Sequence, residues 1–330
     1  MERRLLITGS TGYVGTALAP KLAKKFPVVS YDLQAFGNLI ADVPGITSVQ
    51  GDIRDTKKLL DLVREQQITD VIWLAGIVTD ELTDMNVART REINVDSLRN
   101  ALDAFAGIPL NRFLLMSSSS VYGTTAQPAT EDTLPKPMTA YAQSKLDQEL
   151  VLREHAMSPY CAIRSATLMG PAPRMRLDTI VNVFSKQAWF EKKIVVHDGT
   201  QWRSNVHVYD VVACFERLLA ADLRKIDGKV YNLVQSSKTA IDIAEDVRVG
   251  VGLVTGAVRE ISIEVDKTKT DNRHYRMVAR NLLTDFSWKP NIGIATAAAD
   301  NAMWFHNGNV KDPNSDIYVN TRRMAASMKE

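Results

Sequence analysis

The sequence predicts an α/β protein built on a doubly wound parallel sheet. Short apolar segments alternate with longer amphipathic ones through the first half of the chain, which is the pattern of β-α-β units. Several of the short segments are almost entirely apolar, as strands are when helices cover both faces of a sheet. A glycine-rich turn follows the first of these segments.

The expected elements follow from this periodicity. The apolar runs of the first half predict strands at Leu5–Thr8, Val28–Tyr31, Thr47–Gln50, Val71–Ala75, Arg112–Ser117 and Cys161–Arg164. The amphipathic runs predict helices at Tyr13–Lys25, Lys57–Glu65, Val87–Phe105 and Met138–Glu154. Later, we expect the chain to return and complete the sheet with strands at Val206–Val208 and Lys229–Val234 around a helix at Asp210–Ala221.

The composition favours a small-molecule enzyme. The 330 residues carry 40 Lys and Arg against 38 Asp and Glu, a formal net charge of +2, which is too weak to hold a nucleic acid or an anionic membrane. No apolar run is long enough to span a membrane, and the N-terminus lacks the apolar core of a signal peptide. The chain has two distant cysteines and no metal-ligand spacing among its five histidines. We therefore expect a cytoplasmic protein without a metal site.

The glycine-rich turn, Gly-Ser-Thr-Gly-Tyr-Val-Gly, predicts a dinucleotide site. Gly9, Gly12 and Gly15 let the strand turn sharply, the backbone approach a pyrophosphate and the helix pack on the sheet. Asp32 lies 23 residues after Gly9, at the end of the second strand, where a carboxylate can accept from both ribose hydroxyls. That carboxylate would repel a 2′-phosphate, and residues 33–35 contain no arginine. NAD is thus favoured over NADP.

A break in the pattern after the sixth strand predicts two domains. We assign residues 1–170 and about 201–235 to an NAD-binding Rossmann domain. Residues of about 171–200 and 236–305 would form a smaller, discontinuous C-terminal domain for the substrate. The polar residues 306–330 are expected to be a loosely held tail.

Two acidic or basic features have alternative interpretations. Asp52, after the third expected strand, can accept from an adenine amino group or can cap its own loop. The arginine-rich segment 173–178 can contact a phosphate or an acidic sugar, although a solvent-facing loop is the simpler interpretation.

Tyr141 and Lys145 are candidates for proton transfer. They are four residues apart in an expected helix, so both side chains share one face. A neighbouring ammonium group lowers the pKa of a phenol, which would let Tyr141 remove a proton from a substrate hydroxyl. The serine cluster at 117–120 follows the fifth strand, beside the expected cofactor, and a serine there can polarise the reacting oxygen.

Together these motifs resemble a known family. The glycine turn, Asp32, GDIRD at 51–55, DVIWLAG at 70–76, Asn94, SSSSVYG at 117–123 and YAQSK at 141–145 occur in the order of the extended short-chain dehydrogenase/reductases. More narrowly, the chain resembles the NAD-dependent epimerase/dehydratase family, which acts on nucleotide sugars. The resemblance covers about 290 residues.

The resemblance implies roles for particular residues. It places the catalytic group at Ser118, Tyr141, Lys145 and Asn94. It implies substrate contacts at Ser118, Ser119, Arg203 and Arg273, the two arginines for the nucleotide diphosphate. It implies cofactor contacts at Gly9, Gly12, Tyr13, Val14, Gly15, Asp32, Asp52, Ile53, Leu74, Ala75, Tyr141 and Lys145.

The expected activity is NAD-dependent, 4-epimerase-like chemistry on a nucleotide sugar. Dehydratases of the family carry Thr-Asp-Glu where this chain has Ser118–Ser120, so water elimination is disfavoured. A nucleotide-sugar dehydrogenase or reductase that releases the keto sugar would use the same residues. A regulatory protein that binds the cofactor without turnover is the alternative of another class. The resemblance also implies a homodimer, formed through the helices at Val87–Phe105 and Met138–Glu154.

Overall fold

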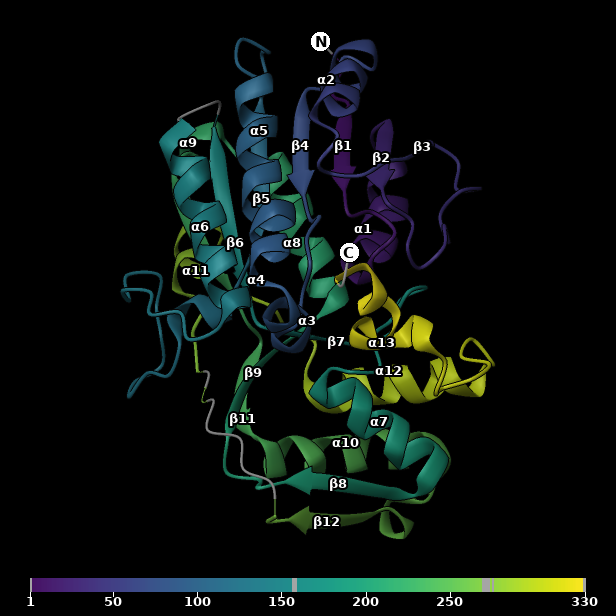
Figure 1. The fold of residues 1–330 in the computed structure, drawn as a ribbon. Coiled ribbons are helices and arrows are strands. Elements are labelled where there is room, and N and C mark those ends of the chain that lie inside the picture. Colours follow the sequence, from purple (N-terminus) through teal and green to yellow (C-terminus); the bar gives the residue numbers. More distant parts are fainter. Residues whose placement is uncertain (1, 156–158, 269–273, 275, 329–330) are drawn as a thin grey trace.

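The computed structural model describes residues 2–155, 159–268, 274 and 276–328. The larger part of the molecule is built around a seven-stranded parallel sheet (Figure 1). Its strand order is β10-β6-β5-β4-β1-β2-β3. The strands are β1 (Leu5–Thr8), β2 (Val28–Asp32), β3 (Ile46–Gln50), β4 (Asp70–Trp73), β5 (Arg112–Ser118), β6 (Tyr160–Ser165) and β10 (Lys229–Leu233). The predicted doubly wound α/β fold is confirmed.

Helices cover both faces of this sheet because its strands present apolar side chains on both sides. Leu5 and Ile7 pack in one core with α1 and α8, whereas Leu6 packs in a second core with α2, α5 and α6. The helices of this part are α1 (Tyr13–Ala23), α2 (Thr56–Glu65), α3 (Asp80–Met85), α4 (Val87–Arg91), α5 (Ser97–Ala104), α6 (Ala140–His155), α8 (Val208–Ala220) and α9 (Leu223–Ile226). A π-helical turn, η1 (Glu92–Asp96), joins α4 to α5, and a 3-10 turn, η2 (Ser119–Tyr122), follows β5.

The strand predicted at Val206–Val208 lies outside the main sheet. The observed β9 (Trp202–His207) pairs with β7 (Thr167–Met169) and with β11 (Ser236–Thr239) in a separate three-stranded sheet. Among the described strands, β10 returns to the main sheet and β9 does not, so the expectation was wrong for β9. The reason is that β7 leaves the main sheet just after β6 and supplies β9 with a partner of its own.

A third core lies at the other end of the molecule (Figure 1). Its elements are α7 (Ile180–Glu191), α10 (Ala240–Thr255), α12 (Ile294–His306) and the parallel pair β8 (Lys193–His197) and β12 (Ser262–Asp266). The short η3 (Val258–Glu260) follows α10, whereas α11 (Arg280–Phe286) packs against β10 of the main sheet. The exact domain boundaries stay a prediction.

The C-terminal residues are packed against the rest of the molecule. They form η4 (Asp316–Tyr318), α13 (Asn320–Met324) and η5 (Ala326–Met328). Tyr318 is 8% exposed and Met328 is 1% exposed. The expectation of a loosely held tail is therefore wrong for these residues, because a few apolar side chains anchor a mostly polar segment. Within the described part of the chain, no helix has the length and apolarity needed to cross a membrane.

The crossing of α10 over α12 depends on a glycine. A Cβ atom on Gly250 would lie 2.1 Å from the carbonyl oxygen of Ala295. Gly250→Val should therefore lower the free energy of unfolding by about 1–3 kcal/mol, measured by urea denaturation. The neighbouring change Val249→Ala, at a 40% exposed position, should stay within about 0.5 kcal/mol of the parent. A stabilised Gly250→Val variant would contradict this packing.

Candidate active site

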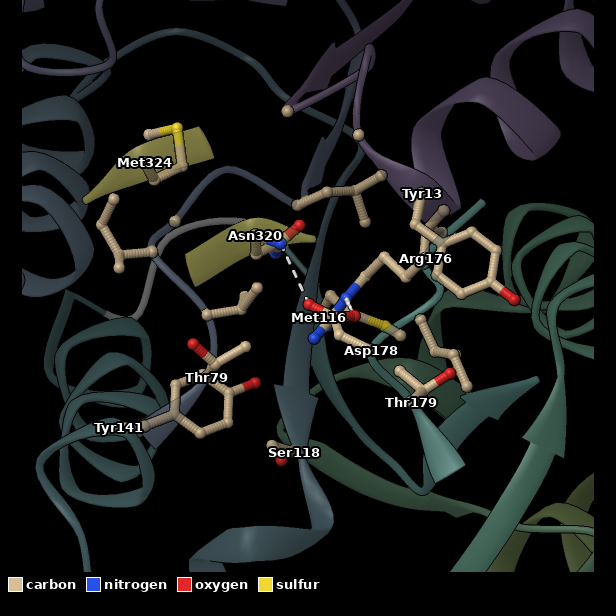
Figure 2. A pocket seen from close by; sticks show the side chains of 18 of the residues that line it. Tyr13, Thr79, Met116, Ser118, Tyr141, Arg176, Asp178, Thr179, Asn320 and Met324 are labelled. Atoms are coloured by element: carbon tan, nitrogen blue, oxygen red, sulfur yellow. Dashed lines mark hydrogen bonds and ion pairs between the residues drawn. The ribbon is translucent and has the colours of Figure 1, made fainter. Parts of the chain in front are cut away.

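A large cavity lies at the carboxyl ends of the central strands, where open α/β sheets bind their ligands (Figure 2). Its volume is about 1060 Å³. Its walls come from the segments after β1, β2, β4 and β5, from residues 165–184 and from the C-terminal residues. Within the described residues, no group of His, Cys, Asp and Glu could hold a metal ion.

The glycine-rich turn forms a close-packed cradle on one side of this cavity. Gly9 has φ +70°, and a Cβ there would lie 2.7 Å from the amide nitrogen of Ala75. A Cβ on Gly15 would lie 2.4 Å from the carbonyl oxygen of Ser10. No side chain caps the first turn of α1, which begins after Gly12. The helix N-terminus therefore keeps its amide groups for an anion, as a dinucleotide diphosphate requires.

Asp32 stands at the end of β2, beside this turn. One carboxylate oxygen accepts from Thr11 N at 3.0 Å and the other from Gln34 N at 2.6 Å. These bonds fix the carboxylate in the cavity wall while each oxygen keeps capacity for a second donor. The glycine cradle and this carboxylate together fit the diphosphate and ribose of NAD.

Asp52 lines the same cavity, and its carboxylate is already engaged with its own loop. It accepts from Arg54 N at 2.9 Å and forms an ion pair with the Arg54 guanidinium at 2.6 Å. These hydrogen bonds hold the pKa of Asp52 below its usual value. The loop-capping role is thus observed directly, and an adenine contact by Asp52 stays a prediction.

Tyr141 lies in the first turn of α6 with its hydroxyl directed into the cavity, close to Ser118 at the end of β5 (Figure 2). Burial raises the pKa of this phenol. A hydrogen bond with Ser118 and the charge of Arg176 act in the opposite direction, while the charge of Asp80 adds to the rise. The pair Tyr141 and Ser118 is therefore arranged to share one reacting oxygen.

Lys145 lines the cavity and is almost completely buried, with 3% of the residue exposed. Its ammonium group donates to Met116 O at 3.1 Å and to Gln148 Oε1 at 3.0 Å. Burial lowers the pKa of Lys145 to about 8, against the opposing charge of Glu149. The expectation that Lys145 lowers the pKa of Tyr141 stays a prediction. The ammonium group donates to these two oxygens, and burial has the largest effect on the pKa of Tyr141.

Asn94 positions the helix that faces α6 and does not line the cavity. It lies in the π-helical turn between α4 and α5, a distortion that often marks functional sites. Its side chain accepts from Ile77 N at 2.7 Å and donates to Ile77 O and to Ser144 Oγ. Its carbonyl oxygen accepts from Gln148 Nε2 at 2.6 Å. Gln148 therefore links Asn94 to Lys145, which the sequence patterns did not indicate.

The remaining predicted positions are also accounted for. Arg203, on β9, is 8% exposed and lines the cavity together with Ser119. Arg273 lies outside the described residues. The other predicted cofactor positions all line the cavity: Tyr13, Val14, Ile53, Leu74 and Ala75.

The structure adds lining residues that sequence reasoning missed. Arg176 and Asp178 form an ion pair at 2.7 Å inside the cavity, between Tyr13 and Tyr141 (Figure 2). The solvent-facing interpretation of segment 173–178 was therefore wrong. Asn320 lines the cavity from the C-terminal end, a position without any sequence signal.

Comparisons with known proteins identify the family of this chain. The family model for the NAD dependent epimerase/dehydratase family matches residues 5–233. A dTDP-D-glucose 4,6-dehydratase of Bos taurus is 21% identical, over 92% of this chain and 90% of the relative. A UDP-N-acetyl-alpha-D-glucosaminuronate decarboxylase of Bacillus cytotoxicus is 28% identical, over 75% of this chain and 80% of the relative.

A solved structure shares the fold. It is the UDP-glucuronic acid 4-epimerase from Bacillus cereus in complex with UDP-glucuronic acid and NAD, with a TM-score of 0.78 and 22% identity. The match covers 92% of this chain and 99% of that chain. Because the family match spans well over half of the chain, the protein belongs to the NAD-dependent epimerase/dehydratase family, and it is an NAD-dependent enzyme of the extended short-chain dehydrogenase/reductase type.

Proposed function

We propose that the protein is a nucleotide-sugar epimerase, 4-epimerase-like, that keeps its NAD through each turnover. The observation that supports this best is the placement of the Tyr141 hydroxyl beside Ser118, in the same cavity as the glycine cradle. Residues 118–120 are all serines, so the three positions at which the family's dehydratases carry Thr-Asp-Glu hold no acid here.

Each side chain has a defined task in this proposal. Ser118 donates a hydrogen bond to the reacting sugar oxygen, and Tyr141 takes the proton from that oxygen and later returns it. The hydroxyl of Ser120, 2.9 Å from Ser118 Oγ, orients that serine. The buried positive charge of Lys145 stabilises the negative charge on the Tyr141 phenolate. The glycine-rich turn and Asp32 would hold NAD, which would supply the acceptor for the hydride of the sugar carbon and allow its return.

Arg203 is the proposed contact for the nucleotide diphosphate. Its guanidinium group is buried in the cavity wall, and the planar fork of arginine can pair with two phosphate oxygens. Ser119 lines the same region, and Arg273 stays a proposed second diphosphate contact. Arg176 reaches the sugar region beside Tyr141, where it would suit an acidic or hydroxyl-rich substituent.

The proposed homodimer would place charged helix faces at its interface. The outer faces of the two helical stretches carry ion pairs within the chain, between Arg91 and Asp147 and between Arg99 and Glu154. Dimer formation therefore stays a proposal, as does a cytoplasmic location. Gel filtration coupled to light scattering would give the mass in solution.

The reaction type is tested by its redox balance. Purified protein is incubated with UDP-, GDP-, dTDP- and CDP-sugars, with and without added NAD, and the products are separated by anion-exchange chromatography. We expect a stereoisomer of one sugar without net NADH. Stoichiometric NADH and a released keto sugar would instead establish the dehydrogenase, and binding of NAD without conversion of any sugar would favour the regulatory alternative.

The role of Tyr141 is tested by removing one oxygen atom. Tyr141→Phe keeps the ring in the cavity wall but removes the proton acceptor, so kcat should fall by about 10²- to 10⁴-fold. Bound NAD should stay at the parental level. Tyr209→Phe is the matched control, because Tyr209 is 45% exposed and does not line the cavity. Unchanged turnover in Tyr141→Phe would contradict the role of Tyr141 in proton transfer.

The charges around Tyr141 predict opposite shifts in the pH profile. Sugar oxidation needs the phenol deprotonated, so kcat/KM should rise with pH through the pKa of Tyr141. Arg176 lowers that pKa and Asp80 raises it. Arg176→Gln should therefore move the rising limb to higher pH, and Asp80→Asn should move it to lower pH. Shifts in the same direction would contradict the assignment of this limb to Tyr141.

A further inference from the structure

Residues 316–328, which we call the C-terminal strap, connect two walls of the cavity. Within the strap, Arg323 Nε donates to Ala35 O at 2.8 Å, in the segment that follows β2 and Asp32. At its other end, Asn86 Nδ2 donates to Met328 O at 3.2 Å, between α3 and α4. The helix α13 of the strap packs beside α3, as Figure 1 shows.

The strap is anchored by apolar packing as well as by hydrogen bonds. Met328 is 1% exposed and packs against Ile77 and Leu82, in the segment after β4. The strap turns three residues to the cavity: Asn320, Met324 and Ser327. It is thus part of the cavity wall.

Asn320 connects the strap to a buried arginine. Its backbone nitrogen donates to Asp178 Oδ2 at 3.0 Å, and its side-chain oxygen accepts from Arg174 Nη2 at 2.5 Å. Figure 2 shows Asn320 above the pair of Arg176 and Asp178. The hydrogen bond therefore fixes one edge of the Arg174 guanidinium from the strap.

Arg174 is placed to meet an anion. It is 3% exposed, lines the cavity and lies with its guanidinium carbon 3.7 Å from the centre of the Phe36 ring. Its backbone nitrogen donates to Thr16 Oγ1 at 3.2 Å, in the first turn of α1. Its Nε has no hydrogen-bond partner among the described residues. A buried donor without a partner is costly unless a ligand satisfies it.

We propose that Arg174 binds the diphosphate of NAD, and that the C-terminal strap retains the cofactor by holding Arg174 through Asn320. The first turn of α1 is where a dinucleotide diphosphate binds, and Arg174 enters this region from outside the glycine-rich turn. An arginine is suited to the task because its fork keeps N–H groups for phosphate oxygens while Asn320 holds another. This inference goes beyond the proposed function, because retention of NAD can be measured without any sugar.

The diphosphate contact is tested with two fragments of the cofactor. Calorimetry on full-length protein stripped of NAD compares ADP-ribose, which contains the diphosphate, with adenosine, which does not. Arg174→Met should weaken ADP-ribose binding about 10- to 100-fold and leave adenosine binding unchanged. Arg322→Met is the control for loss of an arginine on the strap, and it should bind both fragments as the parent does. Equal weakening of both fragments by Arg174→Met, or no weakening, would overturn the contact.

The role of the strap is tested by cofactor release. Holoprotein is mixed with excess ADP-ribose, and the NAD released is followed with time. Asn320→Ala should release NAD at least about 5-fold faster than the parent. The double variant with Arg174→Met should release it no faster than Arg174→Met alone, because Asn320 acts through Arg174. Parental release by Asn320→Ala, or additive effects in the double variant, would overturn this role. Circular dichroism and thermal unfolding of each variant show whether it is folded.

Discussion

The arrangement of the cavity floor depends on the hydrogen bonds that hold the buried ammonium group of Lys145. Lys145 is 3% exposed, so its charge needs hydrogen-bond acceptors, and Met116 O and Gln148 Oε1 provide them. Gln148 in turn holds the carbonyl oxygen of Asn94, in the π-helical turn. These hydrogen bonds fix α6 relative to the distorted helix that faces it and to the end of β5. Because Tyr141 lies in the first turn of α6, the same bonds position its side chain.

A second buried layer supports the first. Glu149, one residue after Gln148, accepts from Ser117 and forms an ion pair with Arg164 at 2.7 Å. Arg164 also donates to Tyr122 Oη at 2.9 Å. The acidic charge of Glu149 opposes the fall in the pKa of Lys145 that burial causes. The ends of β5 and β6 are therefore tied to α6 by charged hydrogen bonds, which are stronger than neutral ones.

The sequence predicted the parts of the site that depend on local spacing. The glycine turn, Asp32 and the pair Tyr141 and Lys145 were found because each lies at a fixed place in a strand-turn-helix unit or on one helix face. Asn320 was missed because long-range folding brings it to the cavity and no local pattern marks it. The segment of Arg174 and Arg176 was noted as a possible phosphate contact, but the local pattern could not separate that role from a solvent-facing loop. The direction of the Lys145 ammonium could not be predicted either, because it depends on which oxygens the surrounding strands and helices leave buried. The separate pairing of β7 with β9 is a further choice between strand partners that local periodicity cannot make.

We propose that Tyr141 takes a proton from a sugar hydroxyl while the carbon that bears this hydroxyl gives its hydride to bound NAD. Once the sugar is identified, a substrate carrying deuterium on that carbon tests this in a single turnover quenched at successive times, with mass spectrometry of the reduced cofactor and of the sugar product. We expect deuterated NADH to form and then decay in the parent while the product keeps the deuterium, and we expect no deuterated NADH in Tyr141→Phe. Product that has lost its deuterium to solvent, or deuterated NADH in Tyr141→Phe at the parental rate, would contradict it.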